Sequence, residues 1–190
     1  MHLHKLILVL VLLIPISLYS QNYVFSIQIK SSVLNVQQFN NNTYDKSIDI
    51  YPLSIYLGNK FKISENYKIE ISPGYFFGGE NFSGFETGIY LRNNIYNDKI
   101  FVALGVNLHY NLGNGHGVTI VEYAPDGIFT NIGASVGVNF NKNVSFLLSY
   151  IKSLSEDYGY SSVFVFEDGS GKVYQRNLFS IIQTGFEFNF

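Results

Sequence analysis

Apolar and polar residues alternate along most of the chain beyond residue 22. In the segment 102–110, Val102 and every second residue after it are large and apolar or aromatic, whereas the residues between them are small or polar. Successive side chains of a strand point to opposite faces, so this period of two predicts strands with one apolar and one polar face. Eight segments show the pattern: 23–30, 51–61, 67–75, 84–92, 102–110, 130–140, 144–151 and 183–190.

The connections between these segments alternate in length. Short connections, rich in the Asn, Asp and Ser that suit tight turns, fall at 64–66, 93–98 and 141–143. The longer connections fall at 32–49, 77–83, 111–127 and 153–176. This alternation predicts an all-β fold, a single antiparallel up-and-down transmembrane β-barrel of about eight strands, with both chain ends at the short-turn end. Pro73 has no N–H to donate to a ladder, so we expect a bulge there.

The N-terminal segment has the pattern of a secretory signal peptide. His2, His4 and Lys5 precede an apolar run over 6–16, and Ser20 then precedes the polar Gln21. The run is too short for a membrane-spanning helix. We therefore expect residues 1–20 to be removed and residues 21–190 to form the barrel domain. The chain has no Cys, which argues against a lipid-anchored lipoprotein.

The composition favours a membrane barrel over a soluble domain. Charged residues make up 14% of the chain and apolar residues 47%, whereas a soluble domain has about 25% charged residues. The net charge of −2, without a basic cluster, argues against a nucleic-acid partner. Aromatic residues near the ends of the predicted strands should form two girdles at the membrane surfaces. One girdle comprises Tyr51, Tyr75, Tyr110 and Tyr150, and the other Phe61, Tyr67, Phe140 and Phe188.

The last predicted strand ends on an aromatic residue. Its apolar face carries Phe186, Phe188 and Phe190, and its other face carries polar or small residues. The segment resembles the C-terminal assembly signal of outer-membrane β-barrels, in which a polar residue and a Gly two places on precede aromatics at the antepenultimate and last positions. The resemblance assigns that role to Gln183, Gly185, Phe188 and Phe190.

Together with the strand pattern, this signal makes region 21–190 similar to the small outer-membrane barrels of the OmpA-transmembrane and OmpX type. The resemblance implies residence in the bacterial outer membrane with both termini in the periplasm. It also implies contact with outer-membrane lipid, lipopolysaccharide and the barrel assembly machinery. It implies no cofactor.

Charged residues on the polar faces of the predicted strands are the first candidate site. They are Lys68, Glu70, Glu86, Arg92 and Glu187. Glu70 and Arg92 should lie nearly opposite each other on adjacent strands and form a lumenal ion pair. The network has two interpretations, a salt-bridged plug that closes the lumen or the gate of a narrow selective pore.

The histidines are a second candidate. Lipid A-modifying barrels carry a Ser, a His and a carboxylate near the outer leaflet, and His109 or His116 could play the His role. The serine two residues away that the deacylase type requires is absent, because Asn111 stands there. Other partners could approach only through the fold: Ser149, Ser153, Glu122 and Glu156. We assign no catalytic residue, and no spacing predicts a metal site.

The last long connection is the third candidate. Apolar residues flank the Gly-rich stretch 167–171 and predict a β-hairpin. They are Val163, Phe164, Val165, Phe166, Val173 and Tyr174. A protruding edge strand can add to the sheet of a host or envelope protein, or the hairpin could pack only on neighbouring loops or lipopolysaccharide sugars. The favoured function is non-enzymatic, surface interaction, adhesion or envelope integrity through the loops, with a lipid A-modifying enzyme or a gated pore as alternatives.

Overall fold

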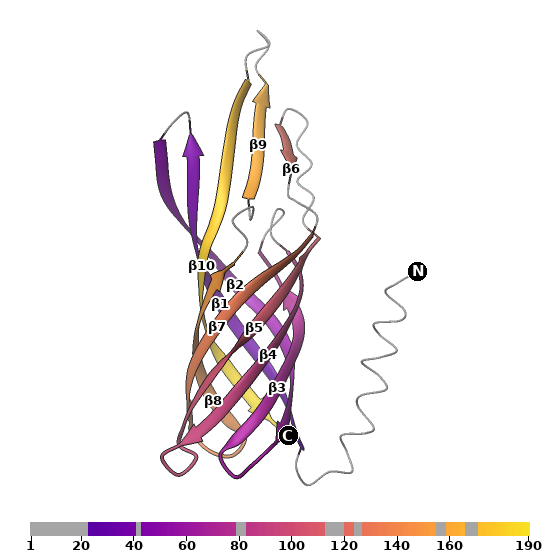
Figure 1. The fold of residues 1–190 in the computed structure, drawn as a ribbon, viewed down its shortest axis with the longest axis vertical. Helices are drawn as coiled ribbons and strands as arrows, with labels where there is room; N and C mark the ends of the chain where they lie inside the picture. Colours follow the sequence, from indigo (N-terminus) through magenta and orange to yellow (C-terminus); the bar gives the residue numbers. More distant parts are fainter. Residues whose placement is uncertain are drawn as a thin grey trace, which may run out of the picture.

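The computed structural model confirms a closed antiparallel barrel of eight strands (Figure 1). The structure describes residues 23–40, 43–78, 83–112, 120–123, 127–154, 159–165 and 171–190, so the expected signal peptide lies outside it. None of these ranges contains a helix long and apolar enough to span a membrane. The strands are β1 (Tyr23–Asn40), β2 (Thr43–Lys62), β3 (Tyr67–Phe76), β4 (Gly84–Ile95), β5 (Ile100–Asn111), β6 (Ile120–Tyr123), β7 (Gly127–Asn139), β8 (Val144–Ser153), β9 (Gly159–Val165) and β10 (Gly171–Asn189).

The barrel wall has the order β1-β2-β3-β4-β5-β7-β8-β10, and β10 pairs back with β1 to close it. The expected short turns connect β2 to β3, β4 to β5 and β7 to β8 at one end. The C-terminus lies at this end (Figure 1), where the Asn189 amide donates to the Asn143 carbonyl and the Phe190 amide to the Phe25 carbonyl. The described chain therefore begins and ends at the short-turn end.

At the opposite end, strands continue beyond the barrel wall. β1 and β2 remain paired up to Asn40 and Thr43, so much of the long connection expected at 32–49 is strand. β10 pairs with β1 on one side and β9 on the other, and β9 pairs with β6. The result is a protruding sheet in the order β2-β1-β10-β9-β6 (Figure 1).

A bulge in β2 separates the barrel wall from the protruding sheet. Lys30 pairs with Ser54 but Ser32 pairs with Tyr51, which leaves one extra residue in β2 at Pro52. The bulge reverses which positions face outward, because an inserted residue shifts the alternation by one. Tyr51 consequently packs against buried apolar residues, with its ring 6.2 Å from that of Phe76. The assignment of Tyr51 to a membrane girdle was wrong.

The bulge predicted at Pro73 was also wrong. Tyr56 pairs with Gly74 and Asn59 with Ile71 in one continuous register on either side of it. On the other side, Pro73 pairs with Thr87 of β4 without a shift.

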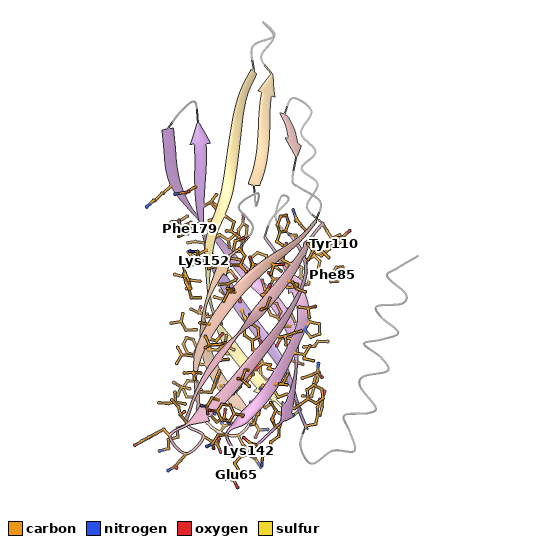
Figure 2. The ribbon with its side chains drawn as sticks, viewed as in Figure 1. Glu65, Phe85, Tyr110, Lys142, Lys152 and Phe179 are labelled. Carbon is orange, nitrogen blue, oxygen red and sulfur yellow. The ribbon has the colours of Figure 1, made fainter. Side chains whose placement is uncertain are left out.

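The predicted faces hold throughout the barrel wall. Apolar side chains such as Ile89 and Leu104 are exposed on the outside (Figure 2), as a lipid-facing surface requires. Phe85 and Tyr110 lie at the protruding end, whereas Glu65 and Lys142 lie at the short-turn end.

Small residues on the inner face make room for a buried aromatic ring. Cβ atoms added at Gly88, Gly105 or Gly133 would each come within 3 Å of atoms of Tyr90. Tyr90 therefore fills a glycine-lined section of a barrel whose interior is only wide enough for side chains.

The inner face becomes apolar toward the protruding end. Seven buried residues from β1, β3, β7, β8 and β10 form one cluster there: Leu34, Val36, Phe76, Phe129, Ile151, Leu178 and Ile181. We call this group the apolar cap. The polar-face pattern of the sequence did not predict it, and it covers the polar part of the lumen.

We predict that Gly105→Ala destabilises the barrel by roughly 1 to 3 kcal/mol, the usual effect of overpacking. The added Cβ would lie 2.0 Å from the Ile89 carbonyl oxygen, and backbone cannot move aside cheaply. Denaturant unfolding from lipid vesicles measures the effect. Gly133→Ala is the matched control, since its Cβ would meet the Tyr90 ring, which can shift. Equal losses for both variants would contradict the prediction.

Candidate functional site

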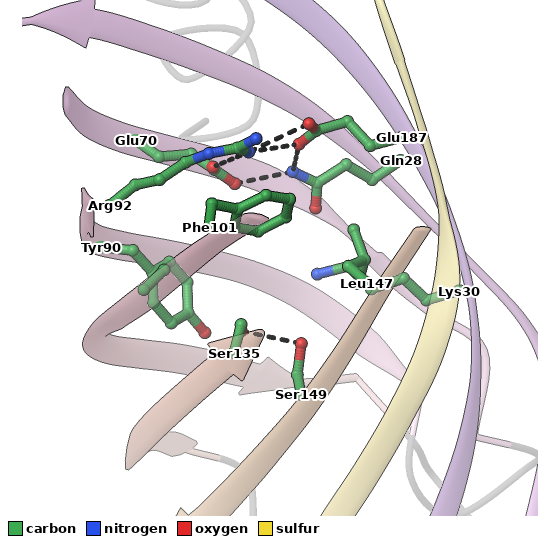
Figure 3. Close-up of a pocket in the computed structure, with 11 residues that line it drawn as sticks. Gln28, Lys30, Glu70, Tyr90, Arg92, Phe101, Ser135, Leu147, Ser149 and Glu187 are labelled. Atoms are coloured by element: carbon green, nitrogen blue, oxygen red, sulfur yellow. Dashed lines mark hydrogen bonds and ion pairs between the residues drawn. The ribbon is translucent and has the colours of Figure 1, made fainter. Parts of the chain in front are cut away.

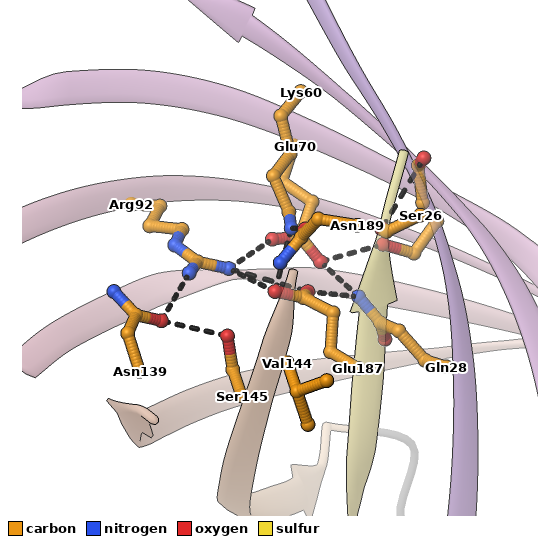
Figure 4. A network of polar contacts seen from close by, with 12 residues as sticks. Ser26, Gln28, Lys60, Glu70, Arg92, Asn139, Val144, Ser145, Glu187 and Asn189 are labelled. Carbon is orange, nitrogen blue, oxygen red and sulfur yellow. Dashed lines mark hydrogen bonds and ion pairs between the residues drawn. The ribbon is translucent and has the colours of Figure 1, made fainter. Parts of the chain in front are cut away.

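Four charged side chains meet inside the barrel near its short-turn end (Figure 4). Glu187 of β10 accepts from Lys60 of β2 at 2.6 Å and from the Arg92 guanidinium of β4 at 3.0 Å. Arg92 also lies 3.4 Å from Glu70 of β3. We call these four residues the lumenal network.

Neutral groups complete the hydrogen bonds of the network. The Gln28 Nε2 donates to Glu70 at 2.7 Å and to Glu187 at 3.0 Å, and the Ser72 hydroxyl donates to Glu70 at 2.8 Å. The Arg92 guanidinium also stacks on the Phe101 ring, 3.4 Å from its centroid. Buried carboxylates are stable only when paired and hydrogen-bonded, and both carboxylates of the network meet this condition.

The buried charges balance in number. Among the described residues, the cations are Lys30, Lys60 and Arg92, and the carboxylates are Glu70, Glu86 and Glu187. Each of these residues is at most 8% exposed. Equal numbers of opposite charges leave this buried set neutral, so it does not produce a field that attracts one sign of ion.

A second polar cluster lies between the network and the apolar cap. Glu86 accepts from the Tyr56 hydroxyl at 2.5 Å and faces His109 Nδ1 at 3.1 Å. Gln183 donates to the Tyr56 hydroxyl at 3.2 Å and to Ser32 at 3.3 Å. The four residues Tyr56, Glu86, His109 and Gln183 thus connect β2, β4, β5 and β10 across the lumen.

The five charged residues predicted from the sequence do not all belong to one network. Glu70, Arg92 and Glu187 come together, whereas Glu86 belongs to the second cluster. Lys68 lies on the inner face beside Arg92 and forms no ion pair with a described residue.

Lys60 and Gln28 also belong to the site, although the sequence did not predict them as members. Both occupy inner-face positions of the predicted strands. Only the pairing of β1 with β2 and β10 shows that they reach Glu187.

A cavity of about 20 Å³ lies beside the network (Figure 3). Its walls include Gln28, Lys30, Ser135 and Ser149. This volume holds roughly one water molecule. It is too small for a hydrated ion.

His109 is fully buried and lies against the apolar cap. Its ring is 6.0 Å from that of Phe76, edge-on, and 6.3 Å from that of Phe129. A lipid substrate outside the barrel would have no access to it.

The other residues considered for catalysis are not brought together in the described part of the chain. Ser149 accepts a hydrogen bond from Ser135 at 2.8 Å inside the lumen, Ser153 ends β8 and Glu122 lies on β6. His116 and Glu156 lie outside the described residues. No group of three potential metal ligands occurs in the described part of the chain.

The predicted hairpin is present in the backbone, but it is not a free edge. Val165 pairs with Gly171 and Val163 with Val173, so β9 and the start of β10 form its arms, while Phe166 lies outside the described residues. The far side of β9 is covered by β6, where Val121 pairs with Val163. The outer strands of the protruding sheet are therefore β2 and β6.

The residues assigned to the assembly signal fall on both faces of β10. Gln183 and Gly185 face the lumen, and a Cβ at Gly185 would lie 2.2 Å from the Ile29 carbonyl oxygen. Phe188 and Phe190 are exposed on the outside.

Comparison with known proteins identifies the type of fold that this chain has. No family model and no curated protein matches the chain. Among solved structures, the outer membrane protein OprG from Pseudomonas aeruginosa is similar, with a TM-score of 0.53, 9% identity and coverage of 89% of this chain and 96% of that one. This chain has the fold of the small outer-membrane β-barrels.

Two further solved structures match the chain at lower TM-scores. Ail of Yersinia pestis, solved with the heparin analogue sucrose octasulfate, has a TM-score of 0.44 and 11% identity, covering 90% of this chain and 100% of its own. Neisserial surface protein A has a TM-score of 0.40 and 13% identity, covering 87% of this chain and 97% of its own.

We predict that Arg92→Met lowers the free energy of unfolding by about 3 to 5 kcal/mol, because it leaves buried carboxylates with one cation fewer. Denaturant unfolding from vesicles measures the loss. Lys142→Met, in an exposed turn, is the control and should change stability by less than about 0.5 kcal/mol. A similar small loss for Arg92→Met would show that the network does not stabilise the barrel.

Proposed function

We propose that this protein is an outer-membrane anchor that presents a β-sheet outside the cell for binding other molecules, and that it has no enzymatic activity. In this proposal residues 1–20 are a cleaved signal peptide, and both termini lie in the periplasm. Outer-membrane lipid and lipopolysaccharide surround the barrel, which the barrel assembly machinery inserts through the C-terminal signal.

The observation that carries the proposal is the contrast between the two ends of the molecule. The lumen contains a neutral network, a cavity of about 20 Å³ and an apolar cap, and these features oppose transport. The opposite end continues as five paired strands. A lumen filled in this way, together with the burial of His109, supports a role for the strands that project from the barrel.

The outer strand β2 is the part of the protruding sheet best suited to contact a partner. Ile48 and Ile50 are 70% and 72% exposed, and over 43–53 the described residues pair with β1 alone. An unpaired strand edge with β-branched side chains is a template for an added strand. Host or envelope proteins with an extended segment are the partners that fit this edge.

Both alternatives from the sequence have less support. The enzyme alternative requires His109 or His116, but His109 is buried beneath the cap. The pore alternative requires the Glu70–Arg92 pair to gate a passage, but the second cluster and the cap would still obstruct it.

We predict that Ile48→Lys combined with Ile50→Lys reduces adhesion of bacteria displaying the protein to about one tenth, because charges on an edge strand oppose strand addition. Counting adherent bacteria on cultured epithelial cells measures the effect. The Ile48→Val, Ile50→Val protein is the matched control and should keep full adhesion. The heat-dependent gel mobility of the barrel verifies that each variant is folded.

Deletion of residues 163–173 is a second arm of that test. It removes the end of the hairpin, which pairs with β6 at Ile120 and Val121, and should also reduce adhesion. Full adhesion by both the double Lys variant and the deletion would contradict the proposed function.

We also predict that the purified barrel gives no stepwise conductance in planar bilayers, in parent form or as Glu70→Gln. The cap and the second cluster remain closed when the Glu70–Arg92 pair is lost. Insertion must be verified in the same bilayers by protease protection. Discrete conductance steps that disappear or grow in Glu70→Gln would favour the gated-pore alternative.

A further inference from the structure

The alternation of apolar and polar residues does not by itself determine how the barrel closes. β1 and β10 are the first and last strands of the wall, and Ile29 pairs with Phe186 where they meet. A slip by one residue would turn apolar side chains into the lumen. A slip by two residues, roughly 6.7 Å, keeps Ile27, Ile29, Phe186 and Phe188 facing lipid. The lipid-facing side therefore cannot distinguish the native register from its two-residue neighbours.

The lumenal side carries contacts that can distinguish them. Glu187 is fully buried and contacts Lys60 of β2 and Arg92 of β4. Neither β2 nor β4 pairs with β10. In an open sheet, β10 lies at one edge, β1 at the other and β2 next to β1, so the Glu187–Lys60 contact exists only after closure (Figure 4).

A second contact between β10 and β2 joins residues with the same displacement along the two strands. Gln183 reaches Tyr56 at 3.2 Å, and Glu187 reaches Lys60 at 2.6 Å. Gln183 and Glu187 are four residues apart on β10. Their partners Tyr56 and Lys60 are also four residues apart on β2. The two contacts therefore specify one and the same register across β1.

Gly185 lies between these two contacts and makes slipped registers sterically unfavourable. A Cβ at its position would lie 2.2 Å from the Ile29 carbonyl oxygen and 2.9 Å from the Lys30 Cα and Cγ atoms. A two-residue slip in one direction would bring Glu187 to this site, and a slip in the other would bring Gln183. Either slip also takes the carboxylate of Glu187 several ångströms from Lys60.

We propose that Glu187, with Gln183 as a second contact, fixes the register in which β10 closes onto β1. Contact with lipid determines which face of β10 points outward. The buried carboxylate of Glu187 determines which residues of β10 pair with which residues of β1. Buried ionic groups can select one arrangement among alternatives of similar apolar burial. Glu187 thereby acts in assembly and stabilises the closed barrel only in its native alignment.

Disulfide trapping can read the closing register directly, because the chain has no Cys. The pair Ile29→Cys, Phe186→Cys reports the native register. The pairs Ile29→Cys, Phe188→Cys and Ile27→Cys, Phe186→Cys report the two slips. Each pair is placed in the parent chain, in Glu187→Gln and in Glu70→Gln. The proteins are refolded into lipid vesicles and oxidised, and the cross-linked fraction is measured on gels.

We expect Glu187→Gln to raise the ratio of slipped to native cross-links about tenfold over the parent, which corresponds to about 1.4 kcal/mol of discrimination. Glu70→Gln is the matched control. It removes another carboxylate of the network, but Glu70 lies on β3, next to the Arg92 strand, and its contact with Arg92 does not depend on closure. It should leave the ratio unchanged.

A second variant provides the test if Glu187→Gln does not fold. Lys60→Met combined with Glu187→Gln removes the buried cation together with its partner, and it should fold and still show raised slipped cross-linking. Native cross-links alone in either folded Glu187 variant would overturn the proposal. An equal rise in Glu70→Gln would also overturn it, because the effect would then come from general destabilisation.

Discussion

Closure of the sheet is the constraint on which the rest of this structure depends. Inside a bilayer, every backbone N–H and C=O must be paired within the protein, and a sheet achieves this only when its first and last strands meet. β1 and β10 meet along most of their lengths, from Ser26 and Asn189 to Asn40 and Tyr174. The alternating faces, the aromatic residues and the short turns all follow from building a wall without edges.

Closure at eight strands creates a narrow interior that side chains must fill. Three solutions are stacked along the axis: a neutral set of ion pairs, a Tyr90 ring over glycines, and the apolar cap. The first two explain why Gly recurs on the inner face, since large side chains from one strand need space on the next. The cap shows that an inner face need not be polar where it does not face water.

The sequence predicted the barrel wall well because its signal is local. Each strand alternates by itself, and the short turns carry their own Asn, Asp and Ser. Other features depend on pairing and were missed. Pro52 shifts the alternation of β2 by one residue, so Ile48 and Ile50 no longer continue the pattern of Leu53 and Ile55, and the protruding part was taken as a loop. Lys60 reaches the network only because β1 pairs with β2 on one side and with β10 on the other. The covering of β9 by β6 joins segments about forty residues apart and has no local signature.

The unbroken passage of β1 and β10 from the wall into the protruding sheet has a mechanical consequence. A partner pulling on the protruding sheet would apply force largely along these strands, which are tilted relative to the barrel axis. Their backbone hydrogen bonds lie perpendicular to the strands, so the force would be shared among many bonds in shear instead of opening them one at a time. The seam that closes the barrel is therefore also the part of the molecule that best resists a pull on the protruding sheet.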